Sequence, residues 1–207
     1  KDQSLFVKSA TDLYNYLHRN GANKLTQISD TSALQQIGKA FSYFARAVDN
    51  GYNANSVCAE NAFYCLAKSV KLGNFYAAPE LYNLVCQRSE LLIDKLIYAH
   101  IRDIQINQPE LSITRLWGFG NPTQNPDARA DAERMVPYLR FYIISQFYDI
   151  SKDETLMPSD IIEYSKSSVA SDLERLSTKA YPKEWLSKGE EYFNYMIEEI
   201  EDTLSKY

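Results

Sequence analysis

Cysteine and histidine are scarce in this chain, which has only three cysteines and two histidines. An odd number of cysteines at wide, uneven spacing is a poor framework for disulfides, so we expect free, buried thiols in a reducing compartment. Neither His18 nor His100 belongs to an HExxH motif. His100 and Asp103 would share a helix face, but this pair alone is typical of a packed or solvated histidine. We therefore predict no metal site.

Motifs of catalysis and phosphate binding are also missing. The sequence has no P-loop and no GxSxG, and Gly118 and Gly120 do not extend to GxGxxG. Paired carboxylates such as Glu190 and Glu191 occur near the C-terminus, but on a polar helix face such pairs are usually solvated. The sequence thus predicts no catalytic residues, no cofactor and no enzyme.

Long hydrophobic runs and an excess of basic charge are absent as well. No apolar stretch approaches the roughly 20 residues of a membrane span. The net charge is −5, and the acidic excess falls within residues 160–207. Nucleic-acid binding requires a basic footprint, so we expect neither a membrane span nor a nucleic-acid partner, and a cytoplasmic location. The sequence starts at Lys1 rather than Met, and removal of an upstream signal peptide would produce the same start.

Apolar residues at helical spacing dominate the sequence, and no alternation of period two indicates a strand. The apolar fraction of 45% is ordinary for a globular chain, so disorder is not expected. Ser32 with Gln35 predicts a capping box, and Asn55 predicts a second helix cap. Predicted helices cover residues 5–17, 34–49, 55–72, 76–101 with a break near 89, 109–117 as a short stretch, 128–150 with an interruption at Pro137, 159–177 and 182–204.

Two segments repeat each other at an offset of 22 residues. They are "KAFSYFARAVDNG" at 39–51 and "ENAFYCLAKSVKLGNFYAAPELYNL" at 60–84. The alanines allow close helix approach and the aromatic residues fill the groove between helices, while a glycine follows each helix. The sequence therefore predicts burial of Phe41, Ala45, Phe63 and Ala67 at helix contacts, with Gly51 and Gly73 just past helix ends.

These segments resemble the Sel1-like branch of the tetratricopeptide-like families. That branch carries K-A-x-x-W-x-x-K-A-A-x-x-G followed by a helix that opens near G-N-x-x-A, and Gly73, Asn74 and Ala77 fall on this pattern. The offset of 22 is shorter than such a repeat, so the first copy is a half repeat, and two similar amphipathic helices remain an alternative. The resemblance implies an all-α fold with an α-α helical-repeat core and a C-terminal helical extension.

The segment "GFGNPTQNPD" at 118–127 is the strongest helix breaker in the chain. It predicts a helical-repeat domain at 1–117, a loop at 118–127 and a C-terminal extension at 128–207 that packs on the first part. The loop is either a plain connection or a binding site anchored by Trp117 and Phe119. Flanking basic residues would make a weak positive patch; these are Arg115, Arg129, Arg134 and Arg140.

A helical-repeat core predicts non-catalytic binding of another protein or peptide, as in a scaffold or adaptor. Tyrosine is abundant, with 16 residues, and supplies contact area at low entropic cost. The predicted partner-binding residues are Tyr43, Tyr64, Tyr76, Tyr82 and Trp117.

Two other functions remain open from sequence alone. The first is a bacterial immunity-type inhibitor, in which the acidic C-terminal quarter holds a basic partner such as a nuclease toxin. The second is a small-molecule carrier with a cavity lined by tyrosines.

Overall fold

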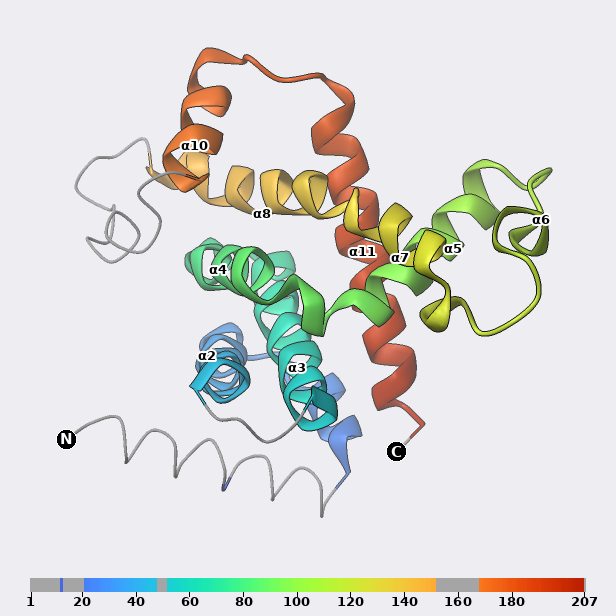
Figure 1. Ribbon diagram of the computed structural model, residues 1–207. Helices are drawn as coiled ribbons and strands as arrows, with labels where there is room; N and C mark the ends of the chain where they lie inside the picture. The colour runs from blue at the N-terminus through green and yellow to red at the C-terminus, as the bar shows by residue number, and fades with distance from the viewer. Residues whose placement is uncertain (1–11, 13–20, 48–51, 152–167, 207) are drawn as a thin grey trace.

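The computed structural model describes residue 12 and residues 21–47, 52–151 and 168–206, and every regular element in these ranges is helical (Figure 1). The all-α prediction is thereby confirmed. Within the same ranges, no helix combines the length and the apolar character needed to cross a membrane. The α-helices are α2 (Thr31–Ala47), α3 (Tyr52–Lys71), α4 (Ala78–Arg88), α5 (Ile93–Asn107), α6 (Ile113–Trp117), α7 (Pro126–Glu133), α8 (Val136–Ser151), α10 (Ser168–Thr178) and α11 (Glu184–Leu204); the 3-10 helices are η1 (Ala22–Gln27), η2 (Phe75–Ala77), η3 (Ser89–Leu91) and η4 (Pro122–Gln124).

Helix starts differ from the sequence prediction at two positions. Asp30 caps α2, because its Oδ1 accepts a hydrogen bond of 2.6 Å from the backbone N–H of Ala33. Ser32 therefore lies inside the helix, and the predicted capping box there is wrong. Asn55 likewise lies inside the first turn of α3, which begins at Tyr52. Local sequence did not distinguish the true caps, since acidic and polar residues cluster at both helix starts.

Helix ends and breaks follow the sequence more closely. Gly73 adopts a positive φ of 97° after α3, and Asn74 N–H donates to the carbonyl of Ser69 at 3.0 Å, as in a Schellman motif. The predicted break near Ser89 is confirmed by η3. The break before α8 comes just ahead of Pro137, because the first turn of a helix tolerates proline. Gly51, the predicted helix 5–17 apart from residue 12, and residues 159–167 lie outside the described residues.

Helices α2, α3 and α4 form the N-terminal part of the core, with α2 packed most extensively on α3. Phe41, Ala45, Phe63 and Ala67 are all buried, as predicted from the repeated segments. α8 covers α4, and α10 packs on α8. Helices from the N-terminal and C-terminal halves of the chain thus share one core.

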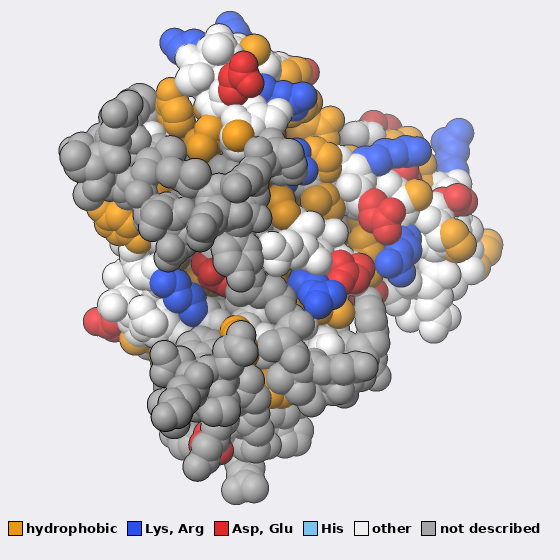
Figure 2. Space-filling model, turned by 60° about the vertical axis from the view of Figure 1, so that its left-hand side comes forward, with side chains coloured by type: hydrophobic (Ala, Val, Ile, Leu, Met, Phe, Trp, Pro, Cys, Tyr) orange, Lys and Arg blue, Asp and Glu red, His pale blue; other side chains and the backbone are white. Residues whose placement is uncertain are grey.

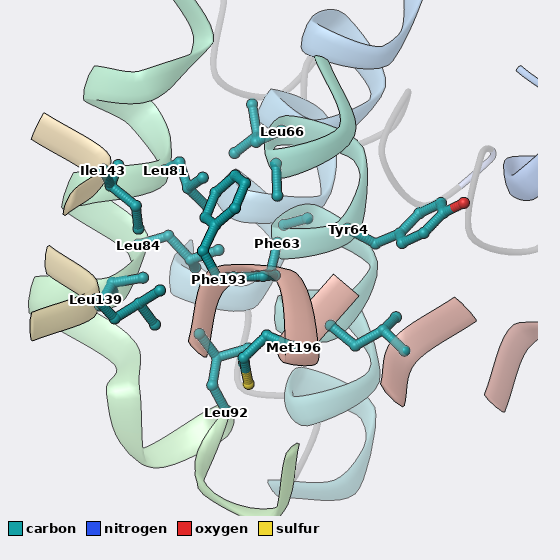
Figure 3. Close-up of a cluster of buried hydrophobic side chains, with 14 of the residues drawn as sticks. Phe63, Tyr64, Leu66, Leu81, Leu84, Leu92, Leu139, Ile143, Phe193 and Met196 are labelled. Carbon is teal, nitrogen blue, oxygen red and sulfur yellow. The ribbon is translucent and has the colours of Figure 1, made fainter. Parts of the chain in front are cut away.

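Helix α11 crosses the middle of the molecule and packs against α8, α5 and α3 (Figure 1). Its Phe193 and Met196 converge with Phe63 of α3, Leu84 of α4 and Leu139 of α8 (Figure 3). Full burial of such side chains contributes about 1.5–3 kcal/mol each. α11 therefore joins N-terminal helices to a C-terminal one, as α8 also does through α4.

Acidic side chains of α11 are paired within the chain. Arg102 of α5 lies 2.6 Å from Glu198, 2.6 Å from Glu199 and 3.3 Å from Asp202, measured between nitrogen and oxygen atoms. The pairs are partly exposed, so each contributes only about 0–1 kcal/mol. They orient α5 along α11 rather than supply most of its stability.

The surface mixes charges of both signs. Figure 2 shows Lys and Arg beside Asp and Glu on the face drawn, with hydrophobic groups between them. Arg129 pairs with Glu133, and Arg134 pairs with Asp131. Arg140 is turned inward, where its Nε lies 2.9 Å from the buried Asp172. Three of the four arginines in the predicted weak positive patch are thus paired with carboxylates, and the fourth, Arg115, is exposed.

At Gly189 the backbone of α11 lies close to α8. A Cβ at this position would clash with the carbonyl oxygen of Tyr138 and would lie 2.5 Å from Cβ of Tyr142. Gly189→Ala gains about 1 kcal/mol of helix propensity, but the backbone of α8 must move. We expect a net loss of about 2 kcal/mol or more in the free energy of unfolding.

Urea unfolding of Gly189→Ala beside Ser187→Ala measures this effect. Ser187 is exposed on the same helix, and its variant should stay within about 0.5 kcal/mol of wild type. A Gly189→Ala variant as stable as wild type would contradict the close packing of α8 and α11.

Candidate functional site

The structure separates the tyrosines that the sequence grouped as partner-binding residues. Tyr64 and Tyr82 are fully buried, Tyr43 is half-buried, and Tyr76 is 47% exposed. Tyr76 packs against Phe147, with ring centroids 6.4 Å apart. The four rings therefore do not form one solvent-facing surface.

Tyr64 and Tyr82 are core residues that use their hydroxyl groups inside the molecule. Tyr64 points away from the apolar cluster around Phe63 (Figure 3), and its hydroxyl donates to Glu201 at 3.0 Å. The Tyr82 hydroxyl donates to the buried Asp172 at 3.1 Å. In this structure neither ring is available to a partner, because a buried Tyr with a paired hydroxyl has no surface to offer.

The loop after α6 does form a concave site. A cavity of about 530 Å³ is lined by residues 113–114, 117–122 and 124–126, and we call it the 113–126 cavity. It lies where α6 and the following loop project from the end of α5, at the right of Figure 1. Trp117, predicted as a partner-binding residue, belongs to its lining.

Asparagine side chains hold this loop in shape. Asn125 Nδ2 donates to the carbonyl of Trp117 at 2.6 Å, while its Oδ1 caps α7 by accepting from the N–H groups of Asp127 and Ala128. The Oδ1 of Asn121 accepts from both the N–H and the hydroxyl of Thr123. Gly118 supplies the positive φ of 75° that ends α6. The loop is thus preorganised by its own sequence.

Two aromatic side chains line the 113–126 cavity. The buried Trp117 forms its floor, and the exposed Phe119 forms its rim. Trp117 is only 9% exposed, and its Nε1–H donates to Asp131 at 3.2 Å. Phe119 is 98% exposed. A fully exposed Phe on a fixed loop makes no contribution to the core, so its apolar surface is free to contact another molecule.

A buried polar network lies behind Trp117 and joins α5 to α11. Tyr192 Oη donates to Asp103 Oδ2 at 3.0 Å and lies 2.6 Å from His100 Nδ1. Lys188 Nζ donates to Asp103 Oδ1 at 2.6 Å. The His100 ring contacts Trp117, with centroids 5.8 Å apart. This network therefore supports the floor of the 113–126 cavity from inside.

Protonation in this network follows from its burial and its hydrogen bonds. Burial lowers the pKa of His100, an effect that Asp103 and Asp131 offset in part. Burial alone would raise the pKa of Asp103, but hydrogen bonds from Lys188, Asn107 and Tyr192 bring it below the usual range. At neutral pH the network thus holds a neutral His100 beside a carboxylate that Lys188 neutralises.

Two of the three cysteines are buried. Burial raises the pKa of the Cys58 and Cys65 thiols to about 12 each. All three cysteines are free, as expected, although Cys86 is exposed rather than buried. In the described residues, no group of three or more His, Cys, Asp or Glu side chains is placed to hold a metal ion.

Sequence reasoning found part of this site. The breaker composition of residues 118–127 and the aromatic pair Trp117 and Phe119 pointed to the loop. The pairing of His100 and Asp103 with Tyr192 and Lys188 was missed, because these residues come from helices far apart in the chain. Only the spacing of His100 and Asp103 on one helix face hinted at it.

Lowered pKa values make the stability of the protein depend on pH. Around pH 6.5 the unfolded chain binds more protons at His100 than the folded protein does, so the free energy of unfolding falls as pH drops from 7 to 5.5. We expect His100→Gln to lose stability less steeply than wild type over this interval. Urea unfolding of both proteins at the two pH values measures the difference, and equal pH dependence would contradict the assignment.

Comparison with known proteins gives no family assignment. No protein-family model, no curated protein and no solved structure matches the chain. Its function must therefore be argued from its own residues and their arrangement.

Proposed function

We propose that this protein is a non-catalytic binding module that holds a segment of another protein at the 113–126 cavity. The observation that carries the proposal is a 98% exposed Phe119 beside a cavity of about 530 Å³ on a loop fixed by internal hydrogen bonds. An exposed aromatic residue at the edge of a preformed cavity is a typical interaction anchor. The module would act as a scaffold or adaptor.

The proposed binding face differs from the one expected along the tyrosines. Burial of Tyr64 and Tyr82 leaves the loop after α6 with the more exposed aromatic surface. Trp117 contributes as the floor of the site, whereas Phe119 offers the contact area. Rigid loops commonly carry binding residues because the scaffold beneath them fixes their geometry.

We also propose that α2, α3 and α4 form a degenerate repeat of the Sel1-like type. Support comes from the equivalent burial of Phe41 and Phe63 and of Ala45 and Ala67 at the contact between adjacent helices. The turn at Gly73 and Asn74 between α3 and α4 fits the same pattern. The repeat would serve as the rigid base of the module, in which residues 1–117 are one part and 128–207 pack on it.

The two other functions receive less support. For an inhibitor of a basic toxin, Glu198, Glu199 and Asp202 stay net acidic around the single Arg102, but they do not line the 113–126 cavity. A carrier with a Tyr-lined cavity would need tyrosines in its lining, and the 113–126 cavity is lined by Trp117 and Phe119 instead.

Phe119→Ser tests the proposed site. Removal of an anchor ring should weaken the complex at least about tenfold while the fold stays intact, because Phe119 has almost no contact with the core. The measurement is affinity capture from the native host with wild type, Phe119→Ser and Leu72→Ser as baits, followed by quantitative mass spectrometry.

Leu72→Ser is the matched control, since Leu72 is 50% exposed and does not line the cavity. Partners retained by wild type and Leu72→Ser but lost by Phe119→Ser would support the site. A Phe119→Ser bait that retains every partner of wild type would show that binding occurs elsewhere.

A further inference from the structure

His100 lies between the polar network of α5 and α11 and the floor of the 113–126 cavity. Its Nδ1 is 2.6 Å from Tyr192 Oη, and its ring contacts Trp117, which lines the cavity. The His100 side chain is 14% exposed, so protons can reach it from solvent. A change of charge on His100 therefore acts directly on a residue of the cavity.

Hydrogen bonds determine where His100 can take up a proton. The Tyr192 hydroxyl has one proton, which it donates to Asp103 Oδ2. His100 Nδ1 must then carry a proton and donate it to Tyr192 Oη. The other ring nitrogen, Nε2, is left with a lone pair, and no described residue donates to it. Protonation of His100 consequently takes place at Nε2 and creates a new, charged donor there.

Charged and titratable groups face His100 from three helices. They are Asp103 of α5, Asp131 of α7, and Tyr192 and Lys188 of α11. Glu191 of α11 pairs with Lys188, Glu90 of η3 pairs with Arg88, and η4 carries no charge. A protonated His100 would thus be attracted by two carboxylates and repelled by one ammonium group.

Asp103 is already held on the Nδ1 side of the ring. Its Oδ2 lies 4.0 Å from His100 Nδ1 and accepts the Tyr192 hydroxyl. Its Oδ1 accepts from Lys188 Nζ at 2.6 Å and from Asn107 Nδ2 at 2.7 Å. Three donors, one of them cationic, keep this carboxylate in place, so it is not the group that moves when Nε2 is protonated.

Asp131 is held more weakly, and it is the residue that fixes Trp117. Among the described residues, its Oδ2 accepts one hydrogen bond, from the Trp117 indole N–H at 3.2 Å, while its Oδ1 pairs with the exposed Arg134. A hydrogen bond from a charged donor is about twice as strong as one from a neutral donor. A protonated His100 would therefore outcompete the indole for Asp131. Attraction between the imidazolium and the indole face would keep the two rings together without restoring the bond from Trp117 Nε1.

We propose that His100 is a pH-sensitive switch for the floor of the 113–126 cavity. Protonation of Nε2 draws Asp131 toward His100, and the Trp117 indole loses its hydrogen bond to this carboxylate. Because burial lowers the pKa of His100, the floor is fixed at neutral pH and released under mildly acidic conditions. Regulation of binding by this switch rests on the function proposed above, whereas the switch itself does not.

The chain has two tryptophans, which make the switch directly measurable. Hydrogen exchange of both indole N–H groups is followed by NMR in the full ¹⁵N-labelled chain from about pH 7.5 to about pH 5, together with the imidazole signals of His100. Trp185 is the internal reference, because it packs against Tyr138 and Phe141 of α8 and no described residue accepts from its N–H. We expect the ratio of the Trp117 to the Trp185 exchange rate to rise about fivefold or more as His100 becomes protonated, through loss of one hydrogen bond.

Three variants identify the groups involved. In His100→Gln and in Asp131→Asn the ratio should stay constant with pH, because the first side chain cannot be protonated and the second has no charge. The Asn oxygen can still accept from the Trp117 indole. His18→Gln is the matched control, since it removes the other histidine of the chain, and it should show the wild-type rise. Asp131 is partly exposed, so Asp131→Asn provides the test even if His100→Gln does not fold.

A ratio that stays constant in wild type while His100 is protonated would overturn the proposal, as would a His100 that is still neutral at about pH 5. A rise that persists in His100→Gln or Asp131→Asn would also overturn it, because another group would then be responsible. The readout needs no partner, so the two proposals fail separately. A constant ratio removes the switch alone, whereas captured partners that do not depend on Phe119 remove the binding site and leave the switch in place.

Discussion

The apolar face of α11 packs on α3, α5 and α8 at once, and this packing joins helices from both ends of the sequence. Phe193 and Met196 are buried among side chains of α3, α4 and α8. At Gly189 the backbones of α11 and α8 come so close that a side chain cannot be added. Helices in globular proteins are stabilised mainly by tertiary packing of their apolar faces. The fold therefore depends on burial of α11 more than on any local preference.

The same helix determines the candidate site. α11 supplies Tyr192 and Lys188, which satisfy the buried Asp103 of α5 and fix His100 against Trp117. A buried carboxylate without these partners would be strongly destabilising. The loop with Phe119 can stay exposed and still keep its shape, because its base belongs to this network and to the asparagine hydrogen bonds. Core packing and the loop that carries Phe119 are thus connected through one helix pair, α5 and α11.

Local patterns in the sequence predicted the helical class, the turn at Gly73 and the burial of Phe41 and Phe63, because these features depend on spacing within one helix. Long-range pairing was not predictable in the same way. From the sequence, Tyr64 and Tyr82 were predicted to be partner-binding residues. In the structure their hydroxyl groups donate hydrogen bonds to Glu201 and Asp172, which are distant in sequence. The Asp30 cap was missed because Ser32 offered an equally good local signal. The composition of residues 118–127 predicted a loop. The cavity in that loop was not predictable, because it depends on the hydrogen bonds that Asn121 and Asn125 make in the folded chain.

Native-state hydrogen exchange of wild type and Phe193→Ala tests the central role of α11 most directly. Loss of this buried ring should lower the free energy of unfolding by about 3–5 kcal/mol. If α11 joins the molecule into one cooperative unit, the slowest amides of α3, near Phe63, and of α11, near Met196, will lose protection by the same amount. Protection that persists in α3 while α11 exchanges freely would contradict this account, since the N-terminal helices would then be stable without α11.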